Sequence, residues 1–205
     1  MLQIKSKYKI AKRLGAGIFE QTQTQKFALS EARSKNTKER RGRRGGSDYG
    51  RQLLEKQKLR YTYGLSERQL SNYAKAAFAV KDPAQALHKS LELRADNTVY
   101  RAGLAPTRRA SRQMVSHGHI TVNGKRITIP SYCVKKGDVV AVREGSRKSE
   151  MYGKINDPEE AGALRKTSWI KFDPALMRAE VIGEPSYSSA ETGIDYSTVF
   201  EFYSR

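Results

Sequence analysis

The stretch PTRRASRQMVSHGHITVNGKRITI, residues 106–129, contains the signals for a helix, a helix stop and a tight hairpin in direct succession. Thr107 is a natural N-cap and Gly118 a natural stop, so a helix of about three turns is predicted between them. Asn123 and Gly124 form the dipeptide that favours a two-residue type I′ turn. We therefore expect a helix followed directly by a β-hairpin.

The predicted helix, residues 108–117, has two chemically different faces. At about 100° per residue, one third of its circumference is polar and collects Arg108, Arg109, Arg112 and Ser116. The opposite side is apolar and collects Ala110, Met114 and Val115. Arginine forks match phosphate oxygens, and we expect these arginines to face solvent. Replacing Arg108 and Arg112 by alanine is then expected to weaken binding to a phosphate-bearing partner and to leave the fold intact.

The two-residue turn also fixes the register of the hairpin. It pairs Val122 with Lys125, Thr121 with Arg126 and Ile120 with Ile127. One face of the hairpin is then apolar and carries Ile120, Val122, Ile127 and Ile129. A further strand is predicted from Val139 to Val142, which gives a small antiparallel sheet beside the arginine helix.

Helical patterns also fill the chain ahead of this region. The segment SDYGRQLLEKQKLRYTYG, residues 47–64, starts with an N-cap in Ser47 or Asp48 and has a basic outer face with interleaved tyrosines. The candidate RNA-binding residues on that face are Tyr49, Arg51, Lys56, Lys58 and Arg60. A capping box formed by Ser66 and Gln69 opens the next helix. From Pro83, apolar residues at turn spacing predict one helix that runs to Ala102 and ends at Gly103.

The charge of the chain points to a phosphate polymer as partner. The 205 residues have a formal net charge of +18, and residues 1–149 alone carry +22 while residues 150–205 carry −4. The first 46 residues contain few apolar positions, so we expect them to form a basic extension that becomes ordered only on its partner. Glycines near its end separate the candidate RNA-binding residues Arg40, Arg41, Arg43 and Arg44.

Several classes of site are disfavoured. The single cysteine, Cys133, excludes an intrachain disulfide and a thiolate zinc cluster. His117 and His119 do not have a recognisable zinc spacing, and no nucleotide-binding loop or nucleophile motif is present. No apolar run approaches the roughly 18 residues of a membrane span. We expect a cytoplasmic protein that is not an enzyme, binds no metal or other cofactor and does not contact a membrane.

Residues 93–144, LRADNTVYRAGLAPTRRASRQMVSHGHITVNGKRITIPSYCVKKGDVVAVRE, resemble the RNA-binding module named after the fourth small-subunit ribosomal protein. The likeness extends to SDYGRQLLEKQKLRYTYGLSERQ at residues 47–69 and to the ending FEFYSR at residues 200–205. The chain is thus similar to the ribosomal family itself, in a bacterial-type form. Two departures are the lack of a cysteine cluster near the N-terminus and GRRGG in place of the usual Gly-Gln-His-Gly.

The resemblance implies an α+β fold and a structural role on the ribosome. Family members bind the five-prime domain of small-subunit ribosomal RNA early in assembly, neighbour the fifth small-subunit protein, help to line the messenger RNA entry region and influence decoding accuracy. The module residues that carry over are Thr107, Arg108, Arg112, Gln113, His117, Asn123 and Gly124. Arg109 is an additional charge, and Lys125 and Arg126 complete the predicted RNA-binding set on the hairpin.

The predicted division of the chain has four parts. A basic extension spans residues 1–46, and a helical domain spans 47–90 and is completed by residues 180–205. The α/β module, two helices packed on an antiparallel sheet, spans 91–150, and a connecting segment that packs on it spans 151–179.

Two other functions remain open from the residues alone. A helix, a short turn and an arginine helix before a hairpin also suggest a helix-turn-helix reader of DNA, although the basic arm fits a folded RNA better. An RNA-modifying enzyme could carry the same module, but it would need a catalytic domain that the remaining residues do not supply.

Overall fold

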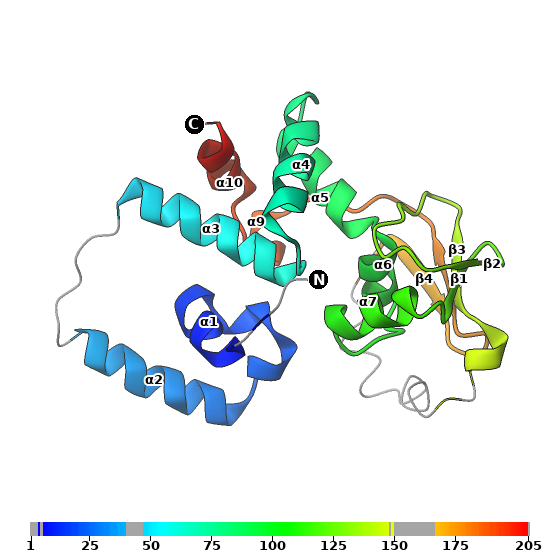
Figure 1. Cartoon of the computed structure of the whole chain (residues 1–205), viewed down its shortest axis with the longest axis horizontal. Helices are drawn as coiled ribbons and strands as arrows, with labels where there is room; N and C mark the ends of the chain where they lie inside the picture. The colour runs from blue at the N-terminus through cyan, green and yellow to red at the C-terminus, as the bar shows by residue number, and fades with distance from the viewer. Residues whose placement is uncertain (1–3, 5, 40–46, 148, 150–166, 205) are drawn as a thin grey trace. The chain divides into compact units, whose positions relative to one another are not determined.

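The computed structural model describes residues 4, 6–39, 47–147, 149 and 167–204. The chain forms two compact units, one made of residues 1–84 with 188–205 and the other of residues 85–187. The first is helical and the second combines helices with a sheet, which confirms the predicted α+β class (Figure 1).

The first unit begins with a folded N-terminal segment. Its elements are α1 (Lys7–Leu14), η1 (Ala16–Ile18), η2 (Glu20–Thr22) and α2 (Gln25–Glu39). Ala11, Phe19 and Phe27 form a small buried cluster, and the ring of Phe19 meets Tyr61 edge-on with centroids 6.4 Å apart. The sequence predicts an extension that orders on a partner; in the structure, residues 7–39 contain helices, and their few apolar side chains pack together. Arg40, Arg41, Arg43 and Arg44 lie outside the described residues.

Two capped helices and the C-terminal helix complete this unit. They are α3 (Asp48–Thr62), α4 (Glu67–Phe78) and α10 (Tyr196–Tyr203), with the short α9 (Ser189–Thr192) before the last. Ser47 caps α3, and Ser66 with Gln69 forms the predicted capping box of α4. The Gln52 side chain of α3 donates to Glu201 of α10 at 2.9 Å.

The helical run from Pro83 is interrupted in the second unit. The structure has α5 (Pro83–Glu92) and α6 (Ala95–Arg101) instead of one predicted helix. Arg94 is extended at the break, and a distant part of the chain provides the missing hydrogen bonds. The amide of Ala95 donates to the carbonyl of Tyr132 at 2.8 Å, and the amide of Val134 donates to Leu93 at 2.8 Å. Periodicity does not reveal such a break, because it depends on a partner remote in sequence.

The helix and hairpin predicted from residues 106–129 are confirmed. Thr107 caps α7 (Arg108–Ser116), and its hydroxyl accepts from the amide of Ala110 at 3.1 Å. Strands β1 (Ile120–Val122) and β2 (Lys125–Ile127) pair in the predicted register. Asn123 and Gly124 have φ values of 51° and 78°, as a type I′ turn requires.

The sheet has five antiparallel strands in the order β2-β1-β3-β5-β4. The other three are β3 (Val139–Val142), β4 (Ile170–Asp173) and β5 (Arg178–Val181), and η3 (Glu144–Ser146) follows β3. Because β4 and β5 are strands of the module, residues 170–179 belong to its sheet and are not a connecting segment, and this unit ends at Tyr187 instead of near residue 180. Residues 151–166 of the predicted connecting segment lie outside the described residues.

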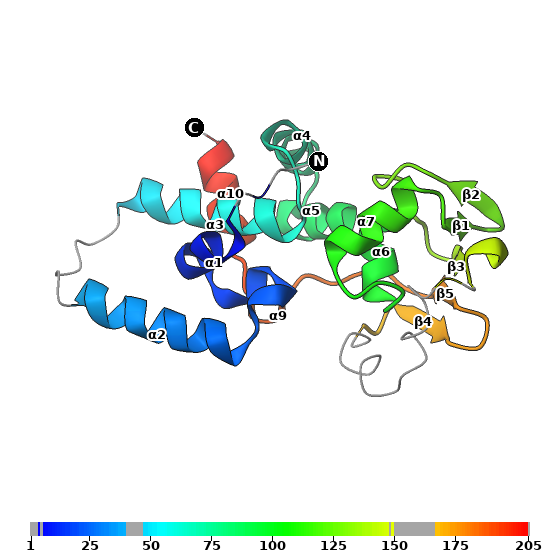
Figure 2. The ribbon, with the colours of Figure 1, turned by 60° about the horizontal axis from the view of Figure 1, so that its bottom comes forward.

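The core of the second unit lies between one face of this sheet and the helices α6 and α7 (Figure 2). Val99, Met114, Val140 and Val181 are almost fully buried there, and Trp169 is 7% exposed. Ile129, which the alternation placed on the apolar face, is 62% exposed because β2 ends at Ile127.

Candidate nucleic-acid interface

Helix α7 presents an exposed row of polar side chains, its outer row. Arg109, Gln113 and Ser116 follow each other at helical spacing and are all exposed, and His117 at the helix end is exposed as well. Arg109 is therefore the arginine of this helix that faces solvent most openly. From the sequence it is expected only as an additional charge.

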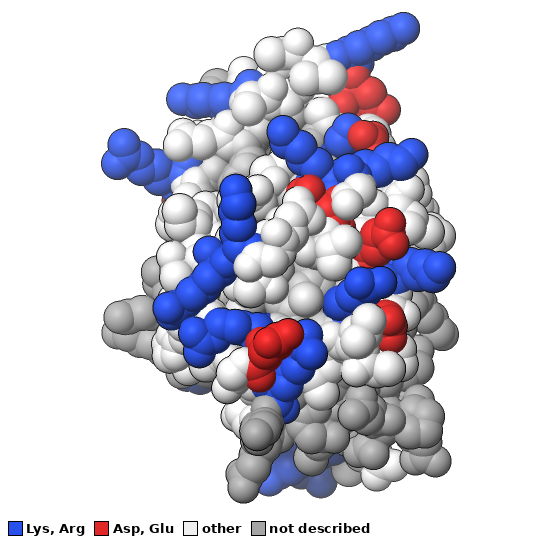
Figure 3. Space-filling model, turned by 90° about the vertical axis from the view of Figure 1, so that its right-hand side faces the viewer, with Lys and Arg blue, Asp and Glu red and all other residues white. Residues whose placement is uncertain are grey.

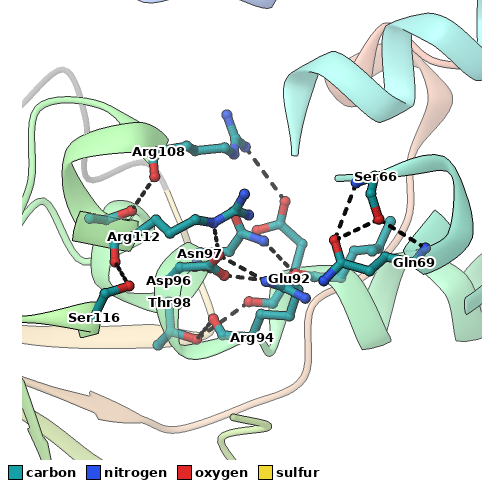
Figure 4. A network of polar contacts seen from close by, with 12 residues as sticks. Ser66, Gln69, Glu92, Arg94, Asp96, Asn97, Thr98, Arg108, Arg112 and Ser116 are labelled. Carbon is teal, nitrogen blue, oxygen red and sulfur yellow. Dashed lines mark hydrogen bonds and ion pairs between the residues drawn. The ribbon is translucent and has the colours of Figure 1, made fainter. Parts of the chain in front are cut away.

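The other two arginines of α7 form a second row that turns toward acidic side chains of the same unit (Figure 4). The Nε of Arg112 donates to Oδ2 of Asp96 at 2.7 Å, and a terminal nitrogen of Arg108 lies 3.7 Å from Oε1 of Glu92. The Arg108 guanidinium also lies 4.5 Å from the centre of the Tyr100 ring. These side chains are only 19% and 14% exposed for Arg108 and Arg112, so the prediction that both face solvent is wrong.

Glu92 and Asp96 are the centres of this network. Each side chain is 1% exposed, and each binds two arginines. Glu92 accepts from Nε and a terminal nitrogen of Arg101 at 2.7 and 2.8 Å. Asp96 accepts from Nε and a terminal nitrogen of Arg94 at 3.0 and 2.9 Å. The carboxylates are buried in hydrogen-bonded surroundings, as buried charges in proteins generally are.

Sequence reasoning missed these two carboxylates. Each directly follows a buried apolar residue of the series Leu91, Ala95 and Val99. An acidic residue within a buried helical segment indicates a buried cationic partner. That signal does not say which arginine is the partner.

The hairpin places two further cations beside the end of α7. Lys125 and Arg126 are exposed, and a terminal nitrogen of Arg126 donates to the carbonyl of His117 at 3.1 Å. The Arg126 guanidinium also crosses Gly118 so closely that a Cβ on Gly118 would lie 2.1 Å from Nε of Arg126. Glycine at position 118 thus permits both the backbone φ of 71° and the close approach of the Arg126 side chain.

The side chain of Asn123 has a structural role within the sheet. Its amide nitrogen donates to Asp138 at 2.8 Å, and its amide oxygen accepts from the backbone of Val139 at 2.9 Å. These bonds fix the hairpin turn to the neighbouring turn before β3. Gly124 leaves open space where a Cβ would project, so the tip of the hairpin is accessible.

The two histidines that flank Gly118 do not form a metal cluster with their surroundings. The rings of His117 and His119 are 6.1 Å apart, and Nδ1 of His119 is 3.0 Å from the hydroxyl of Ser146. Within the described ranges, no three His, Cys, Asp or Glu side chains gather closely enough to hold a metal ion.

In the first unit, the predicted basic face of α3 is only partly a surface. Lys56 is 6% exposed, its Nζ is 2.9 Å from Glu67 of α4, and it lies 4.1 Å from the centre of the Phe202 ring. The placement of Lys56 on an outer face is therefore wrong. Arg60 is partly buried and lies 3.8 Å from the Glu67 carboxylate.

The remaining predicted residues of α3 differ in exposure. Lys58 pairs with Glu55 and is 28% exposed. Arg51 has a side chain that is 67% exposed, and Tyr49 is 51% exposed with its ring 5.8 Å from that of Phe202. Arg51 and Tyr49 are thus the members of this set that a large ligand reaches most easily.

The charges around Glu67 shift two pKa values. Burial alone raises the pKa of Glu67, but hydrogen bonds from Lys56 and Tyr203 and the charges of Lys56 and Arg60 outweigh it, so the pKa is below its ordinary value. Burial, followed by the hydrogen bond to the Glu67 carboxylate at 2.9 Å, raises the pKa of Tyr203. At neutral pH the carboxylate is ionised and the phenol is protonated.

Further exposed cations lie on other parts of the second unit. Figure 3 looks onto one side of this unit and shows Lys and Arg side chains projecting over much of it, with Asp and Glu side chains between them. Among the described residues of this unit, the exposed cations that the sequence did not single out are Lys135, Lys136, Arg143, Lys171 and Arg178. Two of them, Lys135 and Lys136, belong to the turn that contains Asp138, to which Asn123 is bonded.

Known proteins resemble the chain over nearly its full length. The family described as "Ribosomal protein S4/S9 N-terminal domain" matches residues 3–93, and the family described as "S4 domain" matches residues 93–140. No helix in the described parts of the chain is long and apolar enough to cross a membrane.

Curated relatives agree with these matches. The small ribosomal subunit protein uS4 of Roseiflexus sp. (strain RS-1) is 41% identical over 198 residues and that of Roseiflexus castenholzii 45% over 201, each alignment covering 96% of both chains. The uS4 protein of Ligilactobacillus salivarius is 45% identical over 166 residues, which are 80% of this chain and 81% of the relative.

Proposed function

This chain belongs to the small ribosomal subunit protein uS4 family, and from that premise we propose that it binds small-subunit ribosomal RNA through the outer row of α7 and the adjoining hairpin. As in its relatives, its role is that of a structural component of the small ribosomal subunit. The observation that carries the proposed surface is the exposed series formed by Arg109, Gln113 and His117 on α7 with Lys125 and Arg126 beside it.

The geometry of this surface suits phosphates. Arg126 is oriented by the carbonyl of His117, while Lys125 is exposed at the accessible tip of the hairpin. Cations on a helix and on a rigid hairpin contact a folded RNA through backbone and shape, without entering a groove to read bases. Thr107 and Asn123 support the surface by capping α7 and by fixing the turn.

The first unit contributes a second contact area in this proposal. Arg51 and Tyr49 are exposed on α3, and the arginines at positions 40, 41, 43 and 44 precede that helix. Lys58 and Arg60 are partly buried and take part through their exposed edges. Lys56 contributes through the packing of α3, because its ammonium group is enclosed by Glu67 and Phe202.

More detailed roles follow from the family and belong to the proposal. We propose that the protein acts without catalysis, in the cytoplasm, early in assembly of the five-prime domain of small-subunit ribosomal RNA. Contacts with the fifth small-subunit protein and with messenger RNA near its entry site would then link it to translational accuracy.

Binding to RNA fragments tests the central claim. The purified protein is expected to bind the five-prime domain of small-subunit ribosomal RNA, with an affinity that falls steeply as salt rises from about 50 to 200 mM because neutralised phosphates release counterions. Filter binding at several salt concentrations measures both the affinity and the slope. Equal affinity for random duplex DNA at matched salt would contradict the proposal and favour a general polyanion binder.

A further inference from the structure

We propose that Glu92 and Asp96 are positioning residues for RNA binding, which hold the arginines of α7 and α6 in the orientation that meets phosphates. This inference rests on the proposed function and extends it to Glu92 and Asp96, which are negatively charged like the RNA itself. Buried acids beneath a cationic face would be expected to oppose binding if only the sum of charges mattered.

Asp96 joins α6 to α7 through two guanidinium groups. Its Oδ2 accepts from Arg94 at 2.9 Å and from Arg112 at 2.7 Å, while its Oδ1 accepts from Arg94 and from the amide of Asn97, both at 3.0 Å (Figure 4). Arg94 is only 4% exposed, so it balances Asp96 from within. Arg112 comes from the helix that bears the outer row and approaches with its Nε edge.

Glu92 does the same for the arginines nearer the surface. Arg101 binds both of its oxygens, and Arg108 lies 3.7 Å from one of them while resting on the ring of Tyr100. The Arg101 side chain is 31% exposed and that of Arg108 is 19% exposed, whereas Glu92 itself is 1% exposed. A ligand at the surface can therefore reach these arginines and cannot reach the acid that orients them.

The network keeps an excess of positive charge. Four arginines surround two carboxylates, so the six side chains together carry a net charge of +2. Long arginine side chains that are already fixed lose less rotamer freedom when they bind a phosphate, and planar forks bind best in a defined orientation. The carboxylates thus lower the positive charge of this face, but they preorganise its arginines for binding a phosphate.

A single substitution separates positioning from charge. Glu92→Gln removes one negative charge and so raises the net charge of the chain by one. The matched control Glu144→Gln, at an exposed position in η3, makes the same change in net charge. We expect Glu144→Gln to bind the five-prime-domain RNA as tightly as the wild type or more tightly. We expect Glu92→Gln to bind it roughly threefold to tenfold more weakly, the effect of releasing one or two ordered side chains.

The salt dependence provides a readout that a purely structural role would not move. Affinity falls with salt, and a plot of the logarithm of affinity against the logarithm of salt concentration has a negative slope. Each released arginine that no longer neutralises a phosphate makes this slope shallower by about 0.7 to 0.9. We expect a reduced slope for Glu92→Gln and an unchanged slope for Glu144→Gln. Circular dichroism and a melting curve on each variant identify the temperature range in which it is folded, and binding is measured there.

Glu92→Asp is a second variant that keeps the charge. Its shorter side chain still neutralises the cluster but withdraws from Arg108, so we expect weaker binding at wild-type net charge. Wild-type binding by Glu92→Asp, or the same behaviour of Glu92→Gln and Glu144→Gln, would overturn the positioning role. Failure of the wild type to prefer the RNA over duplex DNA would instead overturn the proposed function on which it rests.

Discussion

Helices α3 and α7 look alike in the sequence, since both are capped and rich in basic residues, yet they use their cations differently. In α3, Lys56 is enclosed by Glu67 of α4 and by the Phe202 ring of α10. In α7, Arg109 is exposed while Arg108 and Arg112 are oriented by Glu92 and Asp96. Lys56 of α3 thus joins elements of one unit, whereas the arginines of α7 are divided between support and surface.

The difference shows that the acidic partner decides what a basic residue does. Glu67 lies on a neighbouring helix and is 44% exposed, so it draws Lys56 away from solvent without being buried itself. Glu92 and Asp96 are each 1% exposed, and each is paired with two arginines within the same unit. Four predictions test this contrast, in order of decreasing effect.

The largest effect is expected from Asp96→Ala. The substitution leaves the guanidinium of Arg94, which is 4% exposed, without its bidentate partner. Removing one member of a buried ion pair typically costs about 3–5 kcal/mol of the free energy of unfolding. Urea unfolding followed by circular dichroism measures it, and a loss below about 1 kcal/mol would show that water or another group compensates Arg94.

A smaller loss of stability is expected from Lys56→Ala. The change removes the ion pair with Glu67, the contact with the Phe202 ring and the buried stem, which together account for about 2 kcal/mol of the free energy of unfolding. Binding to the five-prime-domain RNA, measured where the variant is folded, is expected to change by less than a factor of about two. A tenfold loss of binding would place the Lys56 ammonium group in the interface.

Arg109→Ala should show the opposite behaviour. Arg109 is exposed, so the free energy of unfolding is expected to change by no more than about 0.5 kcal/mol. RNA binding should weaken by about 1 kcal/mol, with a lower salt slope, because one phosphate is no longer neutralised. Filter binding alongside Arg68→Ala, an exposed arginine of α4, provides the matched comparison, and equal effects in both variants would mean that binding follows net charge alone.

The smallest effect concerns acid stability and Glu67. Because the pKa of Glu67 is lowered in the folded protein, its ionisation stabilises the fold above the ordinary value of about 4.5. That contribution is lost as the pH falls through the folded pKa. It should stay below about 1 kcal/mol, since the side chain is 44% exposed. Urea midpoints between pH 3 and 7 are expected to fall less steeply with acid in Glu67→Gln, and parallel curves would argue against the effect.

Local signals predicted the module well. Thr107, Gly118 and the Asn123-Gly124 pair act through the backbone of their immediate neighbours, so the helix bounds and the hairpin register could be derived from adjacent residues. The two capping residues of α4 were predictable for the same reason.

Features that depend on remote partners could not be derived in this way. The orientation of Arg108 and Arg112 is decided by Glu92 and Asp96, and a helical wheel gives only the angle of a side chain, which for both arginines falls near the border of the buried face. Strands β4 and β5 were missed because β5 pairs with β3, which is remote in the sequence, and β4 joins the sheet only through β5. The burial of Lys56 likewise needs α4 and the C-terminal helix.

The break between α5 and α6 has a consequence for the order of folding. The first amides of α6, at Ala95 and Asp96, donate to the carbonyls of Tyr132 and Pro130, so this helix is completed by a segment that follows the hairpin in the chain. A helix whose first amides donate to carbonyls remote in the sequence gains this stabilisation only after the chain between them has closed into a loop. We therefore expect amide protons of α6 to gain protection from exchange together with the sheet and later than those of α5, which makes α6 part of the sheet's cooperative unit despite its helical form.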